Sequence, residues 1–257
     1  MKEFFYTFIY NPLYNTLVGI LDIGGWVDLG IAVIILTILV KLVLFPLSIK
    51  AIRTQQLMKE LEEPMKEIRE KYKNNREEQG RKMLELYREK GVNPFSSFAT
   101  LLLQLPIIFG LYFVFFKGGF PEVNPDILYS FVPIPDTVPM LFLGFVDMAS
   151  KSIPLALIAG VTQLIQARYS LPAPKPRGEN PTMQEDFARS MQLQMRYTLP
   201  VLVGVIAYVA SAAVALYLIT SNIFAIGQEI YVRKKLGIER GVRKEAEKSK
   251  SSTKEEK

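Results

Sequence analysis

The chain has 257 residues, of which 49% are hydrophobic, and it carries a formal net charge of +6 with no cysteine and no histidine. Without these two residue types there are no disulfides, thiol nucleophiles, histidine acid–base catalysts or usual zinc and haem ligands. The hydrophobic residues stand in long charge-free runs without polar alternation, which favours membrane-spanning helices over a barrel. The predicted fold class is therefore an all-α integral membrane protein.

Residues 1–27 form an aromatic-rich amphipathic stretch that is interrupted by Asn11-Pro12 and closed by Gly24-Gly25. Little positive charge precedes its apolar residues and no small-residue cleavage site follows them, so the stretch does not resemble a signal peptide. We expect an interfacial helix on the outer face of the membrane. A frayed hydrophobic terminus is the alternative.

The first predicted span covers residues 28–49, and Lys41 lies well inside it. At about 1.5 Å per residue, Lys41 is roughly 13 Å from the end of the segment at Lys50, which is deep for a lysine to reach that surface. The apolar stretches, 29–59 among them, contain no acidic residue that could form an ion pair within the membrane. Lys41 is therefore expected to be either neutral in a dry site or charged in a water-filled cavity.

The segment 51–91 is rich in Lys and Arg and is therefore expected on the cytoplasmic side. Apolar residues at helical spacing predict two helices in it, separated at Asn74-Asn75 and ended by Gly91. Pro64 predicts a kink or a short break in the first of them. The segment is thus expected to be a cytoplasmic helical hairpin.

The second predicted span, 95–116, contains no charge and returns the chain to the outside. The loop that follows, 117–151, carries four acidic residues against two lysines at its ends, which fits an external loop. Its apolar middle, 138–146, is too short to cross the membrane and is expected to lie against its surface. The third span, 152–171, leads back to the cytoplasm, where a polar, proline-rich loop follows up to residue 196.

The run from Tyr197 to Gly227 has 31 residues without a charge, which is long for one span and tight for two. One crossing would leave the basic tail, 233–257, outside while the preceding basic loop stayed inside. We therefore predict a short fourth span at 197–209 and a longer fifth span at 212–232, with a turn at 210–213. The tail has too little apolar content to fold and is expected to be disordered.

Several spans supply uncharged polar side chains that are expected to line a hydrated cavity together with Lys41. Thr37 and Lys41 share one helix face, and so do Gln163 and Gln166. Thr162 and Ser221 are further polar residues of these spans, although a single such residue is more often an interhelical hydrogen bond than a site. The candidate substrate-binding groove, open to the cytoplasm, consists of Lys41, Thr37, Gln104, Gln163, Gln166, Asn222 and Gln228.

A cavity with one cation and several uncharged polar groups suits the transient binding of an amphipathic, often acidic segment. Tight ion coordination would need carboxylates or converging carbonyls, and a proton relay would need acidic residues or histidine within the spans. Hydrolysis would need an activated nucleophile beside a base. We therefore expect a protein that is not an enzyme, with no catalytic residue, metal ligand or cofactor.

Four stretches, read in order, resemble one known family. They are LTILVKLVLFPLSIK, a charged hairpin ending in YREKGVNPF, LLLQLPIIFGLY and LYLITSNIFAIGQEIYV. Together they are similar to the YidC/Oxa/Alb membrane protein insertase family over about residues 5–232, in its short form without a large external domain. The resemblance implies five transmembrane helices, an external N-terminus, a cytoplasmic hairpin and a hydrophilic groove open to cytoplasm and lipid. The basic residue of that groove is usually arginine in the family, and Lys41 stands at the matching position, with the same charge but without the planar fork.

The function that the resemblance implies is insertion and chaperoning of integral membrane proteins in the bacterial plasma membrane, with the C-terminus in the cytoplasm. Nascent membrane proteins and the lipid bilayer are the implied partners. The Sec translocon and the ribosome are candidate partners through the hairpin and the tail, although the tail also fits simple topological retention and solubility. A small-solute transporter or channel subunit with the same cavity is the main alternative, and a passive assembly scaffold is a third.

Overall fold

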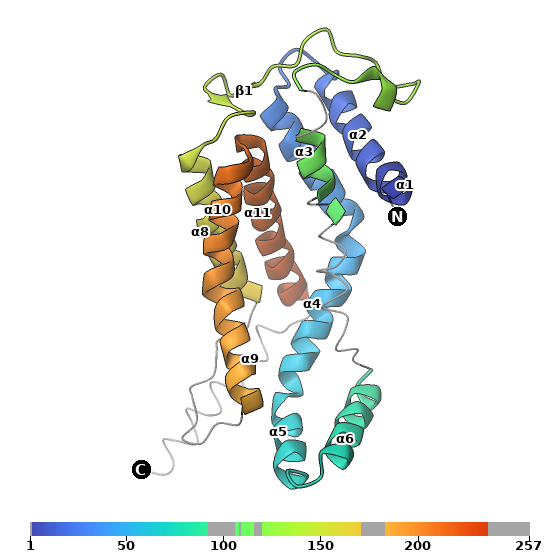
Figure 1. Ribbon diagram of the computed structural model, residues 1–257. Helices are drawn as coiled ribbons and strands as arrows, with labels where there is room; N and C mark the ends of the chain where they lie inside the picture. Colours follow the sequence, from blue (N-terminus) through green and yellow to red (C-terminus); the bar gives the residue numbers. More distant parts are fainter. Residues whose placement is uncertain (1, 92–105, 108, 116–119, 171–182, 236–257) are drawn as a thin grey trace. The chain divides into compact units, whose positions relative to one another are not determined.

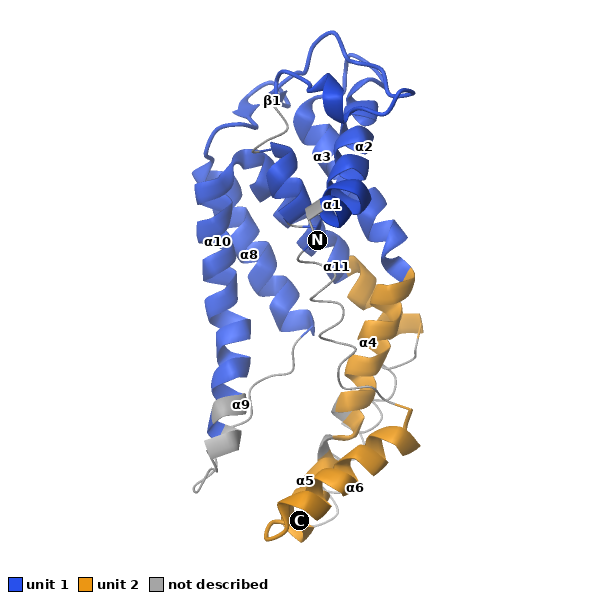
Figure 2. Ribbon diagram, turned by 45° about the vertical axis from the view of Figure 1, so that its right-hand side comes forward, with its two compact units in different colours: residues 1–45, 101–226 blue, residues 46–100, 227–257 orange. Residues whose placement is uncertain are grey.

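The computed structural model describes residues 2–91, 106–107, 109–115, 120–170 and 183–235 (Figure 1). The chain divides into two compact units, coloured separately in Figure 2. Unit 1 comprises residues 1–45 and 101–226, and unit 2 comprises residues 46–100 and 227–257. Gln104, most of the second predicted span and most of the predicted tail lie outside the described residues.

The described part of the chain is mainly helical. Its helical elements are α1 (Lys2–Phe5), η1 (Tyr6–Tyr10), α2 (Asn11–Leu21), α3 (Leu29–Val43), α4 (Phe45–Glu60), α5 (Glu62–Lys71), α6 (Arg76–Glu89), η2 (Pro125–Ile127), α8 (Ile153–Ser170), α9 (Met183–Leu193), η3 (Gln194–Thr198), α10 (Leu199–Ala210) and α11 (Ala212–Lys235). Two short strands in the described part, β1 (Leu141–Phe142) and β2 (Val146–Asp147), pair antiparallel.

The N-terminal segment is helical through α1, η1 and α2, and α2 packs on α3 within unit 1. The chain stays helical through Asn11-Pro12, but its form changes there, because the π-helical η1 ends at Tyr10 and Pro12 stands in the first turn of α2, where its missing amide is tolerated. Tyr10, Tyr14 and Leu17 on one face of this segment are buried. The segment is thus a packed part of unit 1 and not a frayed terminus, while its place at the membrane interface stays a prediction.

Helix α3 has a defined start and ends earlier than the predicted first span. The Asp28 carboxylate accepts a hydrogen bond of 2.8 Å from the Ile31 amide and so caps the helix. At the other end, Leu44 separates α3 from α4. Pro46, two residues later, has no backbone amide hydrogen and therefore cannot continue the hydrogen bonds of α3. The first predicted span is therefore a broken helix, and Lys41 lies in the last turn of α3.

Helices α8 and α10 pack closely because small residues line their contact. A Cβ built on Gly160 would lie 3.4 Å from the carbonyl oxygen of Pro200, and one built on Gly204 would lie 3.5 Å from that of Ala156. Ala207 of α10 is buried in the same apolar cluster as Ala156. Contacts of this kind are typical of helix pairs in membranes, where small residues let two backbones approach.

The turn predicted between the last two spans is confirmed at Ser211, whose extended backbone (φ −171°, ψ 167°) separates α10 from α11. The fourth span, predicted at 197–209, belongs to a longer helical stretch, because α9, η3 and α10 continue helically from Met183. The residues of this stretch include good helix formers such as Met, Gln, Glu, Ala and Arg. The loss of hydrophobicity therefore marks where the apolar surface ends and not where the helix ends.

Among the described helices, Arg189–Ala210 and Ala212–Lys235 are long and apolar enough to cross a membrane. Residues Leu29–Val43 and Phe45–Met58 pass the same test when they are counted as one broken span. Helix α8 matches the predicted third span at 152–171 in its bounds but not in hydropathy, since two glutamines and Arg168 interrupt its apolar residues. The count of five spans stays a prediction.

Within unit 2, α5 and α6 pack against each other as an antiparallel pair. Leu61 and Met65 are buried in a small apolar cluster to which Met83, Leu86 and Tyr87 contribute from α6. The Tyr87 hydroxyl donates a hydrogen bond of 3.3 Å to the Met65 sulfur, and burial raises the pKa of Tyr87. These contacts give the charged segment a core of its own.

The breaks predicted for this segment are confirmed. The chain leaves the helical path at Leu61, three residues before Pro64. In a continuous helix the backbone amide of residue 64 would donate to the carbonyl of Glu60, and proline has no amide hydrogen to do so. Asn75 caps α6 by accepting a hydrogen bond of 3.1 Å from the Glu78 amide. Gly91 follows α6 with a positive φ of 61°, a conformation that favours glycine at helix ends. The cytoplasmic location of the pair is not tested by these bonds.

Residues 120–152, here named the cap, cover the ends of several unit 1 helices (Figure 1). The cap is bonded to α2 through Asn15, whose side-chain amide donates to the carbonyl of Ile127 at 2.9 Å and whose oxygen accepts from the amide of Tyr129 at 2.6 Å. The Tyr14 hydroxyl accepts a further bond of 2.8 Å from the Asn124 amide. These bonds fix the first half of the cap on α2.

The second half of the cap is bonded to the first residues of α3 and α11. The Leu29 amide donates to the carbonyl of Pro139 at 2.9 Å, and the Ala212 amide donates to that of Ser150 at 2.8 Å. The cap thus satisfies helix-terminal amides that have no partner within their own helices. It therefore joins elements that are far apart in sequence.

Candidate functional site

Five polar side chains of α8 and α11 lie together in unit 1. We name them the polar cluster, which consists of Thr162, Gln163, Gln166, Ser170 and Asn222. The Gln163 amide donates to Gln166 Oε1 at 3.2 Å, and the Gln166 amide donates to Ser170 Oγ at 3.0 Å. Asn222 of α11 donates to Thr162 Oγ1 at 3.3 Å. The structure thus bonds two of the predicted groove residues, Gln163 and Gln166, to each other, and it bonds a third, Asn222, to Thr162.

The polar cluster arises from residues spaced four apart on an otherwise apolar helix. Thr162, Gln166 and Ser170 follow each other at this spacing, so they stand on one face of α8. Ser170 is absent from the predicted groove, although its position four residues after Gln166 is a signal that could have identified it. Most members are half-buried, whereas Asn222 is only 7% exposed. The cluster therefore offers hydrogen-bond donors and acceptors without charge.

Thr37 and Lys41 lie one turn apart on α3, as the sequence predicts. The Thr37 side chain is buried, and its hydroxyl donates to the carbonyl of Val33 at 2.6 Å. Thr37 thus satisfies its hydroxyl within its own helix. The break at Leu44 places Lys41 in a last helical turn, where the partial negative charge of the final carbonyls favours a cation.

Gln228 belongs to unit 2, where its side chain is only 7% exposed. Among the described residues its amide nitrogen finds no hydrogen-bond partner. The next residue, Glu229, is also buried and forms an ion pair of 2.8 Å with Arg233 one turn later. An acidic residue at the end of the fifth predicted span is thus neutralised within its own helix. The structure does not relate Gln228 to the polar cluster, and Gln104 lies outside the described residues.

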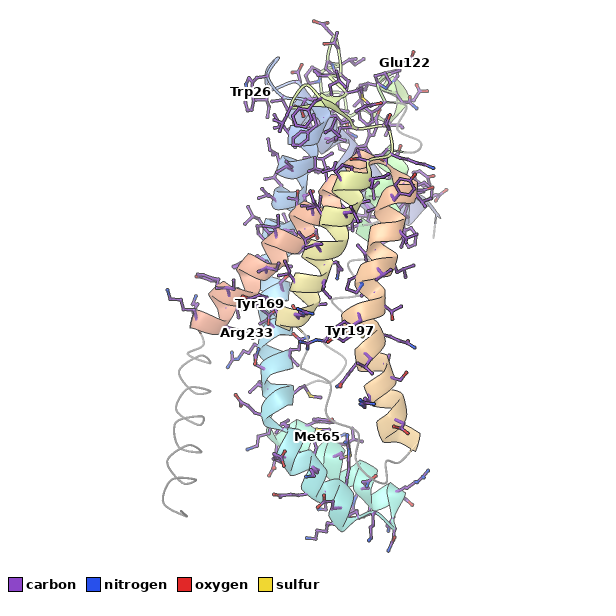
Figure 3. The ribbon with its side chains drawn as sticks, turned by 90° about the vertical axis from the view of Figure 1, so that its left-hand side faces the viewer. Trp26, Met65, Glu122, Tyr169, Tyr197 and Arg233 are labelled. Atoms are coloured by element: carbon purple, nitrogen blue, oxygen red, sulfur yellow. The ribbon has the colours of Figure 1, made fainter. Side chains whose placement is uncertain are left out.

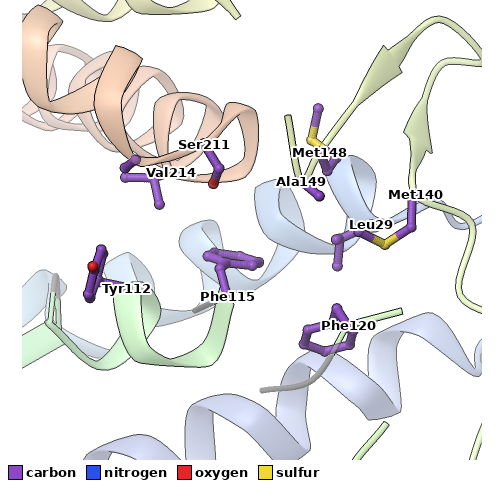
Figure 4. Close-up of a pocket in the computed structure, with 10 residues that line it drawn as sticks. Leu29, Tyr112, Phe115, Phe120, Met140, Met148, Ala149, Ser211 and Val214 are labelled. Carbon is purple, nitrogen blue, oxygen red and sulfur yellow. The ribbon is translucent and has the colours of Figure 1, made fainter. Parts of the chain in front are cut away.

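Unit 1 also contains a cavity of about 250 Å³ below the cap (Figure 4). Its lining is mainly apolar and comprises Leu29, Tyr112, Phe115, Phe120, Met140, Met148, Ala149, Ala210, Ser211 and Val214. None of the predicted groove residues is among these lining residues. The cavity and the polar cluster are therefore separate features.

The polar groups of the cluster offer hydrogen bonds, and Lys41 of α3 offers a positive charge. Within the described ranges, no three His, Cys, Asp or Glu residues come together as a metal site would require. The side chains of the cluster are neutral, and their hydrogen bonds form two sets, one of Gln163, Gln166 and Ser170 and one of Thr162 and Asn222. Such groups can equally bind water or the backbone of a polypeptide segment.

Residues 22–239 match the model of the family described as 60Kd inner membrane protein. The membrane protein insertase YidC of Clostridium tetani is 33% identical over 206 residues, which cover 80% of this chain and 81% of that protein. The membrane protein insertase YidC of Oceanobacillus iheyensis is 28% identical over 210 residues, 80% of this chain and 74% of that protein. In Francisella tularensis subsp. novicida the identity is 29% over 207 residues, again 80% of this chain but 32% of the longer relative. The chain therefore belongs to the 60Kd inner membrane protein family, the YidC/Oxa/Alb insertases that its sequence resembles.

Proposed function

We propose that this protein inserts integral membrane proteins into the bacterial plasma membrane and helps them to fold. The observation that carries the proposal is the family match over residues 22–239, together with relatives that are named membrane protein insertases. The apolar helices Arg189–Ala210 and Ala212–Lys235 agree with a membrane location. No step of this activity needs a catalytic residue, because insertion makes and breaks no covalent bond.

In this proposal the polar cluster, together with Lys41, Thr37, Gln104 and Gln228, forms a hydrophilic groove open to the cytoplasm and to lipid. The support is the character of the hydrogen bonds on α8, which join side chains of one helix and can be exchanged for bonds to water or substrate. Lys41 supplies positive charge that recruits acidic external segments of substrates. A lysine attracts such a segment as a point charge, without the two-point geometry of arginine.

Insertion through such a groove requires no external energy source beyond partition of the substrate. Hydration of the groove lowers the cost of moving a polar segment, which is about 3 kcal/mol for a single charge at the centre of a helix on insertion scales. Transfer of the apolar substrate helix into lipid yields about 0.8 kcal/mol per buried methylene. A substrate with a short polar segment and one long apolar helix is therefore favoured.

The proposed topology places the N-terminus outside and the C-terminus in the cytoplasm. The paired helices α5 and α6 then face the cytoplasm, where their charged surface receives substrate or contacts partner proteins. The basic tail, 233–257, is suited to electrostatic contact with ribosomal RNA. The Sec translocon is a further proposed partner. The comparisons give no support to the alternative of a solute transporter or channel subunit, since the matched relatives are named insertases.

The test is reconstitution of the purified protein in liposomes with a short single-span substrate that carries an acidic external segment. We expect the substrate to become protected from added protease at a yield well above that of empty liposomes. A yield equal to that of empty liposomes would remove the insertase proposal. Solute uptake by the same liposomes, without substrate protection, would favour the transporter.

The groove is tested with substitutions of Lys41 in the same assay. Lys41→Glu should lower the protected yield most, Lys41→Ala should lower it less, and Lys41→Arg should keep it. Lys151→Glu is the matched control, because it reverses the charge of an exposed lysine at the end of the cap. Unchanged insertion by Lys41→Glu would remove the role in recruitment without removing the insertase activity itself.

A further inference from the structure

The turn between β1 and β2 presents large apolar side chains to the surroundings of the cap. Leu141, Leu143 and Phe145 are 53%, 60% and 74% exposed. The ten residues from Thr137 to Val146 include no charged residue. An exposed apolar loop of this kind is costly in water and therefore indicates a surface that is covered in the working protein.

The backbone of this turn holds an apolar side chain outward against its own conformational preference. Leu143 has a φ of +51° and Gly144 a φ of +82°, as in turns that usually contain Asn-Gly. A leucine at positive φ is strained, and such strain persists only where surrounding bonds impose it. Asp28 Oδ2 supplies one such bond by accepting from the Leu143 amide at 2.9 Å. The sequence therefore keeps a bulky apolar residue where asparagine would fit the backbone better.

The turn is also held against the first residues of α3. A Cβ on Gly30, the second residue of α3, would collide with the ring of Phe142 next to the turn. The carbonyl of Pro139, just before β1, accepts from the first amide of α3. The exposed residues of the turn thus lie at the level where an apolar helix begins.

Aromatic residues mark both ends of this apolar region within unit 1. Trp26, the single tryptophan of the chain, is 67% exposed and stands two residues before Asp28, the residue that caps the start of α3. Figure 3 shows it at the end of unit 1 that carries Glu122, whereas Tyr169 lies near the opposite end of α8 and Tyr197 lies at a similar level, midway along the helical stretch from α9 to α10. Tryptophan and tyrosine are enriched at the two interfaces of a membrane. Helix α8, with 18 residues, is about 27 Å long, close to the thickness of a hydrocarbon core.

We propose that Trp26, Leu143 and Phe145 form a lipid anchor that enters the headgroup region of the bilayer and holds the cap against it. Lipid fits this surface better than a protein partner, because the turn is free of charge and unit 1 exposes further apolar residues at the start of α8, such as Ile153, 60% exposed, and Leu157, 65% exposed. A protein-binding patch usually has a polar rim. The anchor goes beyond insertion as such, because it positions the cap whether or not substrate is present.

The first test uses the native Trp26 as a fluorescent reporter in vesicles that contain only this protein and lipid. Its emission should shift to shorter wavelength relative to the detergent-free unfolded chain. Lipids brominated near the carbonyl end of their acyl chains should quench it, and aqueous iodide should have little effect. Emission that iodide quenches freely and brominated lipid leaves unchanged would overturn the placement of Trp26 in lipid.

The second test places the reporter in the turn by combining Phe145→Trp with Trp26→Phe. Quenching by brominated lipid is expected again. The matched control combines Glu122→Trp with Trp26→Phe, because Glu122 is an exposed acidic residue of the same cap, and this tryptophan should be quenched by iodide instead. Equal iodide quenching of both variants would show that the turn faces water. The turn would then be a surface for a protein partner or for a second copy of the chain. That outcome would overturn the anchor and leave the insertion assay unaffected.

Leu143→Asn separates the anchor from a merely structural role. Asparagine suits the backbone of this turn, so the variant should fold at least as well as the wild type and keep its melting temperature in detergent. With the Phe145→Trp reporter, Leu143→Asn should reduce quenching by brominated lipid, because one apolar contact is lost. Unchanged quenching would contradict a contribution of Leu143 to the anchor.

Discussion

The cap and the polar cluster both depend on hydrogen bonds to polar side chains, but these bonds connect very different parts of the chain. At the cap, Asn15 of α2 bonds to the backbone of Ile127 and Tyr129, which are more than a hundred residues away in sequence. In the polar cluster, Gln166 bonds to side chains three and four residues away on its own helix. The bonds of the cap therefore join different elements and fix the tertiary structure. Most bonds of the cluster join residues of one helix and do not hold elements together.

We expect this difference to separate a structural from a functional use of polar residues in an apolar protein. Removing one partner of a bond to buried backbone leaves that backbone unsatisfied and costs stability. Bonds between exchangeable side chains on one helix can be replaced by water or by a polypeptide segment at little cost. The following predictions test this separation through the free energy of unfolding in detergent.

The largest effect is expected for Asn15→Leu. Leucine fills the space but leaves the Ile127 carbonyl and the Tyr129 amide without their bonds, so stability should fall by about 4 kcal/mol, as expected for two unsatisfied groups. Unfolding followed by circular dichroism in a denaturing detergent measures the change. Thr16→Val is the control, because the Thr16 hydroxyl bonds within its own helix, to the carbonyl of Pro12. A similar loss in both variants would contradict a special role of the bonds between α2 and the cap.

A smaller effect is expected at the contact of α8 with α10. Gly204→Leu forces the two helices apart and should cost about 3 kcal/mol, at the upper end of the range for overpacking. Gly204→Ala is the matched control, because a Cβ at this position lies at an ordinary contact distance of 3.5 Å from the Ala156 carbonyl oxygen. If Gly204→Ala were as damaging as Gly204→Leu, close backbone approach would not be what positions α8.

The Asp28 carboxylate should contribute about 2 kcal/mol, because Asp28→Ala removes both the helix cap and the bond to the Leu143 amide. Asp28→Asn should cost about half as much, since asparagine still caps the helix with its oxygen but offers an amide to Leu143. The same unfolding measurement distinguishes the two variants. Equal losses in both would show that the bond to the turn does not stabilise the cap.

The sequence predicted the elements that depend on local signals. Asn75 and Gly91 marked the ends of α6 because their capping conformations are local. The turn predicted at 210–213, which the structure has at Ser211, followed instead from the basic segments on both sides of the apolar run. The cap could not be predicted in the same way, because strands of two residues show no periodicity. The side chains that bond the cap to the helices, those of Asn15 and Asp28, are more than a hundred residues away in sequence. The bonds of Asp28 and Asn15 therefore appear only in three dimensions.

The candidate site was predicted in part for the same reason. Spacing on one helix identified Gln163 and Gln166, and composition identified Asn222, whereas its bond to Thr162 depends on how α8 and α11 pack. For Lys41, the sequence suggested a cation deep inside a straight span. The break at Leu44 changes the physical setting, since Lys41 stands at a helix end where the backbone itself favours positive charge.

The smallest effect on stability is expected for the bond between Asn222 and Thr162. Asn222→Leu and Thr162→Val should show a coupling of about 0.6 kcal/mol in a double-mutant cycle, the average for hydrogen bonds between membrane helices. Their effect on protease-protected insertion should nevertheless be clear, because each removes a polar group from the proposed groove. The cluster would then resemble the cap in its chemistry and differ from it in its role.

Thr220→Val provides the control for this last comparison, because the Thr220 hydroxyl bonds to the carbonyl of Leu216 within α11 and lies outside the polar cluster. It should change neither stability nor insertion. Two results would contradict the functional role of the cluster. If Asn222→Leu lost as much stability as Asn15→Leu, the interhelical bond would be structural like those of the cap. If Asn222→Leu and Thr162→Val inserted substrate as well as Thr220→Val, the path of the substrate would have to lie elsewhere on unit 1.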